Sequence, residues 1–82
     1  MPEFELTSHA YDMLDERKIL EEWLLKTIRD PDDHQMGEDN NMHYMKSIPE
    51  RGEQILHVVV NPHVLPNRVI TVFFDRRLRK KK

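Results

Sequence analysis

Residues 8–19 read SHAYDMLDERKI, and this stretch decides how the rest of the chain is arranged. Its apolar residues recur at helical spacing, and Thr7 or Ser8 is a good N-cap, so the sequence predicts a short amphipathic helix that ends near Lys18. Ile19 then turns into the core. A second helix follows at once, and the two helices together need an apolar surface on which to pack.

Residues 20–28 read LEEWLLKTI and form the second predicted helix. Its apolar positions fall at i, i+3, i+4, i+7 and i+8, which is a nearly complete core stripe. The stripe consists of Leu20, Trp23, Leu24, Thr27 and Ile28. The helix should stop at Asp30, because a residue that precedes proline avoids the helical conformation.

Extended segments make up most of the remaining chain. Residues 54–60 and 68–75 are rich in β-branched and aromatic side chains and predict two strong strands. Residues 42–48 predict a weaker strand, and residues 33–36 are candidates for a short edge strand. Short loops join these segments, so neighbouring strands should be antiparallel. The sequence therefore predicts an α+β fold with two N-terminal helices packed on a three- to four-stranded antiparallel sheet.

The two strong strands lack a purely polar face. In the first, Leu56, Val58 and Val60 should face one way, while Ile55, His57 and Val59 face the other. In the second, alternation places Ile70, Val72 and Phe74 opposite Val69, Thr71 and Phe73. An apolar face without cover would be an association site, so a homodimer is one possible arrangement.

The 82 residues suit a single domain, and no membrane span, cysteine framework or glycine-rich phosphate loop is present in the sequence. We expect a cytoplasmic protein without a cofactor. The net charge of −2 hides an asymmetry, because residues 1–40 carry −8 and residues 41–82 carry +6. The basic tail, residues 76–82, predicts contact with nucleic acid or an acidic protein, although a solvated terminus would have the same composition.

The order and spacing of several short motifs resemble the family called domain of unknown function 4258. The motifs that carry the resemblance are Ser8-His9-Ala10, Arg17, Ile19, Asp30-Pro31, Leu56 to Val60 and Val69 to Phe73. That family is similar to the RelE/ParE and BrnT toxins, which are compact α+β proteins. The resemblance implies a metal-independent ribonuclease that an antitoxin-like protein holds inactive.

Cleavage of RNA without a metal needs a base, an acid and cations around the phosphate. His9 is the best candidate for the base, and Arg17 could clamp a phosphate, although about 12 Å of helix separates them. Residues that could complete the cleft or bind the nucleic acid come from the strands and the tail. They are Tyr44, Arg68 and Arg76 for the cleft, and Arg77, Arg79, Lys80 and Lys81 for nucleic-acid binding.

Structural roles compete with these assignments. His9 could be a structural histidine that hydrogen-bonds the backbone or a carboxylate, and Arg17 could tie the helix to the sheet through Asp75 or Glu53. The histidines show no metal-binding spacing, although His43 and His57 could face each other across a hairpin.

The alternative to an enzyme is a protein- or nucleic-acid-binding module. The small net charge of the chain favours a binding module. Met13 favours it too, because the family that the sequence resembles often has a second arginine at this position.

Overall fold

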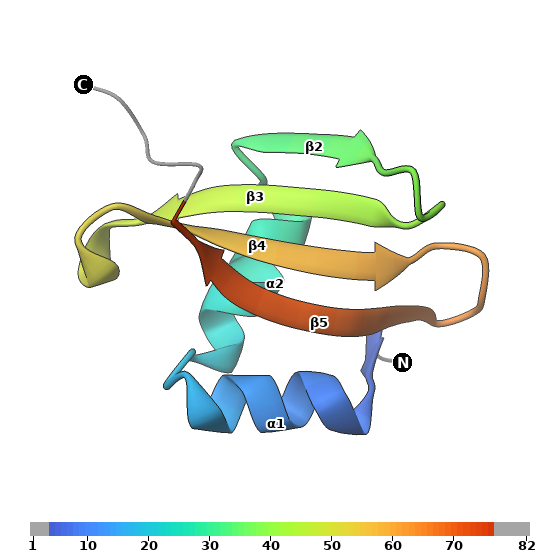
Figure 1. Cartoon of the computed structure of the whole chain (residues 1–82), viewed down its shortest axis with the longest axis horizontal. Coiled ribbons are helices and arrows are strands. Elements are labelled where there is room, and N and C mark those ends of the chain that lie inside the picture. The colour runs from blue at the N-terminus through green and yellow to red at the C-terminus, as the bar shows by residue number, and fades with distance from the viewer. Residues whose placement is uncertain (1–3, 77–82) are drawn as a thin grey trace.

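The computed structural model describes residues 4–76. Three N-terminal elements come first, namely strand β1 (Phe4–Leu6), helix α1 (Ser8–Glu16) and helix α2 (Glu21–Arg29). Strands β2 (Asp33–Met36), β3 (Met42–Ile48), β4 (Gln54–Asn61) and β5 (Asn67–Asp75) follow, with a short 3-10 helix, η1 (Pro49–Arg51), between β3 and β4. The strands form one twisted sheet, α2 crosses behind its centre, and α1 runs beside β5 (Figure 1).

The sheet has five strands in the order β1-β5-β4-β3-β2, so the expected three- to four-stranded sheet was too small. The expectation of purely antiparallel pairing was also wrong, because β1 pairs with β5 in parallel. This strand has only three residues, and its partner is the last strand of the chain. A segment this short carries no periodic signal, and it precedes the helices that were expected to come first. The edge strand expected at residues 33–36 is confirmed as β2.

Both predicted helices are present, with shifted ends. Lys18 adopts a positive φ of 57°, so the chain reverses there and α1 ends two residues earlier than expected. Leu20 becomes the N-cap of α2 and stays 50% exposed, which makes its predicted place in the core wrong. The other four positions of the predicted stripe are buried, from Trp23 to Ile28.

The core lies between the helices and one face of the sheet. Its completely buried apolar residues come from α1, α2 and two strands, and they are Ala10, Leu24, Leu56, Val58, Val60, Val69 and Val72. Helix α2 contacts β3 and β4, whereas α1 contacts β5 and β1. Only α2 therefore lies across the sheet, and the expectation that both helices do so was wrong (Figure 1). We call the sheet face opposite α2 the open face.

The alternation predicted for β4 is confirmed, but that of β5 is broken by a bulge. Val60 pairs with Val69 and Val59 pairs with Thr71, so Ile70 is the extra residue. Val69 and Val72 consequently both face the helices, although they are three residues apart. Thr71 lies on the open face with its partner Val59.

Candidate functional site

Helix α1 is fastened to β5 at the bulge, and this fixes where His9 lies. The backbone N–H of Thr7 donates to the carbonyl of Val69 at 3.1 Å, and its hydroxyl donates to the carbonyl of Ile70 at 3.1 Å. The same hydroxyl accepts a hydrogen bond from the N–H of Ala10, so Thr7 is also the helix N-cap. The imidazole of His9 thereby reaches the Thr71 hydroxyl, with Nε2 and Oγ1 3.2 Å apart.

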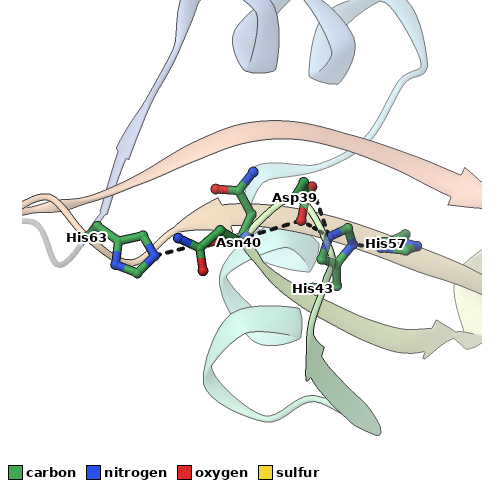
Figure 2. A network of polar contacts seen from close by, with 6 residues as sticks. Asp39, Asn40, His43, His57 and His63 are labelled. Atoms are coloured by element: carbon green, nitrogen blue, oxygen red, sulfur yellow. Dashed lines mark hydrogen bonds and ion pairs between the residues drawn. The ribbon is translucent and has the colours of Figure 1, made fainter.

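A continuous run of polar contacts crosses the open face from β5 to the β2–β3 turn. Nδ1 of His57 lies 3.1 Å from Oδ2 of Asp75, and Nε2 of His57 lies 2.8 Å from Nδ1 of His43. Nε2 of His43 then lies 3.1 and 3.2 Å from the two carboxylate oxygens of Asp39. We call these four residues the histidine chain; Figure 2 shows the contact between its two rings and the end at Asp39. The expectation that His43 and His57 face each other is confirmed.

His57 is held firmly by the strand that follows it. Its ring stacks on Phe73, with 4.8 Å between the centroids and 24° between the planes. The side chain of Asp75 is only 4% exposed, and it accepts the Nδ1 hydrogen of His57. A buried carboxylate needs such donors, because burial without them costs several kcal/mol. The inner end of the histidine chain is therefore held by a ring stack and a buried carboxylate.

The outer end of the histidine chain belongs to the turn of residues 37–41. Asp39 accepts a hydrogen bond from the N–H of Asn41, and His63 from the β4–β5 loop bonds the carbonyl of Asn40 (Figure 2). Gly37 lies directly under the ring of His43, since a Cβ there would come within 2.6 Å of Nε2. The hydrogen bonds from His43 and from the Asn41 backbone lower the pKa of Asp39 below its ordinary value.

Counting protons shows which charge state completes the histidine chain. Each of its three contacts needs one hydrogen on a ring nitrogen. An ionised carboxylate can only accept a hydrogen bond, and two nitrogens without hydrogens cannot form a hydrogen bond with each other. Two neutral imidazoles carry only two N–H groups between them. With both carboxylates ionised, all three hydrogen bonds are made only when one ring is an imidazolium and the other is neutral, and a second imidazolium would set two N–H groups against each other.

His9 joins the same face as the histidine pair. Thr71, Val59 and His43 are cross-strand neighbours, so the His9 contact on Thr71 lies two strand spacings from His43, about 10 Å. Arg68 lies about 10 Å further along β5. It is paired with Glu5 of β1 at 3.5 Å, and about half of its side chain is exposed.

The other residues predicted for the cleft lie elsewhere. Arg17 is the exposed C-cap of α1. Tyr44 pairs with Val58, lies on the helix side of the sheet and stacks on His34. Arg76 follows the end of β5, about 26 Å along the strand from Arg68. The predicted nucleic-acid-binding residues Arg77, Arg79, Lys80 and Lys81 lie outside the described residues.

Two further groups were missed from the sequence. Asp75 was considered only as a partner for Arg17, because the bulge hides the register that brings it to His57. Asp39 was not singled out from the sequence. Its position four residues before His43 was the available signal, since a tight turn returns the chain over that distance.

The described part of the chain offers neither a metal cluster nor a membrane helix. Residues 4–76 hold no group of three or more histidine, cysteine, aspartate or glutamate side chains arranged to bind a metal ion. Among the described helices, none has the length and apolar composition needed to cross a membrane. A groove of about 500 Å³ on the helix side is lined by nine residues, among them Trp23, Lys46 and Glu53.

Comparison with known proteins places the chain in a family. The family described as Domain of unknown function (DUF4258) matches residues 6–74, and the chain belongs to it. Searches of the curated proteins and of the solved structures found no match. The family expected from the sequence is thus confirmed, whereas the comparisons add nothing on the likeness to RelE and BrnT toxins.

Proposed function

We propose that this member of the family is a metal-independent ribonuclease with its centre on the open face of the sheet. The observation that supports the proposal is the meeting of three histidines there from different elements. His9 comes from α1, His43 from β3 and His57 from β4. Histidine is the side chain best suited to donate and accept protons near neutral pH.

The reaction needs two proton transfers on opposite sides of a phosphodiester. His9 takes the proton of the 2′-hydroxyl, whose oxygen attacks phosphorus and forms a 2′,3′-cyclic phosphate. The bond from phosphorus to the 5′-oxygen breaks, and the His43–His57 pair supplies the proton that this oxygen takes up. A phosphate with a hydrogen bond on each side fits the span of about 10 Å, because each bond takes about 3 Å.

Charge stabilisation would come from Arg68 and from the basic tail. Arg68 is the described cation nearest to the His9 contact along β5, and its partner Glu5 is exposed enough to be displaced by a phosphate. The tail, residues 76–82, would bind the RNA beyond the cleaved bond. Such an activity would require an antitoxin-like partner in the cell.

Cleavage of a folded RNA by the purified chain tests the proposal. We expect cleavage between pH 6 and 8 in the presence of a chelator, with 2′,3′-cyclic phosphate ends. His9→Ala and His57→Asn should each lower the rate by about 10²–10⁴-fold, the usual contribution of a general acid or base. His34→Ala is the matched control, because His34 is exposed on the other side of the sheet. Intact RNA with the wild-type protein would overturn the proposal.

A binding module is the second candidate, and one observation favours it. All four ring nitrogens of His43 and His57 already have hydrogen-bond partners within the chain. Neither ring can therefore donate to a substrate as the structure stands. RNA binding that weakens steeply with salt, without cleavage, would support this candidate over the enzyme.

A further inference from the structure

The two ends of the histidine chain differ in how easily they can be released. The side chain of Asp75 is 4% exposed and belongs to a central strand, whereas that of Asp39 is 48% exposed and belongs to a turn. Both carboxylates accept hydrogen bonds from histidine nitrogens. Only the bond to Asp39 can be exchanged for another acceptor without opening the sheet.

The group released by such an exchange would be an N–H donor on a positively charged pair. The complete chain holds one imidazolium, and Asp39 is the carboxylate that faces it from the solvent side. Replacing Asp39 by another anion keeps all three hydrogen bonds and the same charge state. Replacing it by water leaves the positive charge without its outer partner, which is less favourable.

We propose that Nε2 of His43 is an anion-binding position, which Asp39 fills in the free protein and a phosphate oxygen fills after displacing it. Asp39 then acts as a built-in competitor, and the turn of residues 37–41 must move for the site to open. We expect the anion to be a phosphate, because the proposed ribonuclease would bring an RNA phosphate to the same face. The identity of the anion therefore rests on the proposed function.

The surroundings of His43 set how strongly Asp39 competes. The charged and titratable groups near the pair are Asp39 from the turn, Asp75 from β5, Asp33 from β2 and His9 at Thr71. The exchange leaves the buried bond to Asp75 unchanged. An exposed charge pair shifts an equilibrium by about two- to fivefold, so removing the charge of Asp39 should raise phosphate affinity by that factor.

Titration of inorganic phosphate, followed by the ¹⁵N signals of the histidine rings, tests the site directly. In wild-type protein we expect the Nε2 signal of His43 to respond to phosphate. In Asp39→Asn, which keeps an acceptor of the same shape, the response should occur at a two- to fivefold lower concentration. Asp33→Asn is the matched control, because it removes the same charge from the same face without touching His43. It should titrate like the wild type.

Four outcomes decide the matter. No response of His43 at any phosphate concentration would overturn the inference. Equal phosphate affinities in Asp39→Asn, Asp33→Asn and the wild type would also overturn it. A stronger response to an RNA oligonucleotide than to free phosphate would identify RNA as the source of the anion. A phosphate response without RNA cleavage would reject the proposed ribonuclease and leave the anion site standing.

Discussion

The two faces of the sheet are buried to a similar extent by different means. On the helix side, Leu56 and Val58 are fully covered by the helices and their neighbours. On the open face, Met45 and Val59 are only 7% and 6% exposed, although no helix lies over them. The rings and carboxylates of the histidine chain occupy this face, with His57 stacked on Phe73.

The two faces therefore differ in what they contribute: one mainly to the stability of the fold, the other mainly to the proposed function. The buried core on the helix side is apolar, so its burial contributes through the hydrophobic effect. The open face is completed by groups that carry protons and charges, and each depends on a specific partner. Two of the apolar residues expected to need cover from another molecule, Ile55 and Val59, are already covered within the chain, and so is Met45 on the same face.

The largest effect is expected on the helix side. Leu56→Ala removes a side chain that is 0% exposed, so the free energy of unfolding should fall by about 2–5 kcal/mol. Urea denaturation measures this change. Leu65→Ala is the control, because Leu65 is 95% exposed and its loss should change stability by less than about 0.5 kcal/mol. Equal effects at the two positions would contradict the described core.

A smaller effect is expected from the buried end of the histidine chain. Asp75→Ala leaves the Nδ1 hydrogen of His57 without this acceptor, which should lower the free energy of unfolding by about 1–3 kcal/mol. The exposed Asp33 on β2 provides the control, and Asp33→Ala should be nearly neutral. If Asp75→Ala were as stable as the wild type in urea, the open face would contribute nothing through this contact.

The junction between α1 and β5 should show a smaller effect again. Thr7→Ala removes the N-cap acceptor and the bond to Ile70, for a loss of about 0.5–2 kcal/mol. Thr7→Ser keeps the hydroxyl and should recover most of the stability in thermal unfolding. The His9 ring signal should also change in Thr7→Ala, because the helix start places His9 on Thr71. A serine variant as unstable as the alanine variant would assign the effect to the lost methyl group instead.

The smallest effect concerns pH and the exposed end of the histidine chain. The pKa of Asp39 is lower in the folded chain than its ordinary value, mainly through His43. Its contribution to stability is therefore present above the unfolded pKa of about 3.9 and is lost as the pH falls through the folded value. Asp39→Asn should be slightly less stable than the wild type at neutral pH, and the difference should vanish in acid. Glu38→Gln, which removes a carboxylate from the same turn, is the control.

Much of the fold could be predicted from the residues themselves. The stripe from Trp23 to Ile28 is long enough to define α2, and the β-branched run from Ile55 to Val60 defines β4. Strand β1 could not be predicted, because its three residues gain stability only from pairing with a strand at the far end of the chain. Such non-local pairing leaves no mark on local periodicity.

The candidate site was predicted only in part. His9 was singled out from its motif, and His43 and His57 from their places on a hairpin. Asp75, the partner of His57, depends on a register that the bulge shifts by one residue. Arg17 and Tyr44 were grouped with His9 by residue type, but a helix end and the opposite sheet face separate them from it.

The bulge at Ile70 makes the length of β5 as important as its composition. Strict alternation through all residues from Val69 would turn Thr71, Phe73 and Asp75 toward the helices, whereas the extra residue Ile70 keeps them on the open face. A conservative substitution at Ile70 would act only locally. An insertion near this position should therefore be far more damaging than a point change, because it exchanges the two faces along the rest of the strand, whereas loss of one residue at the bulge leaves the faces as they are.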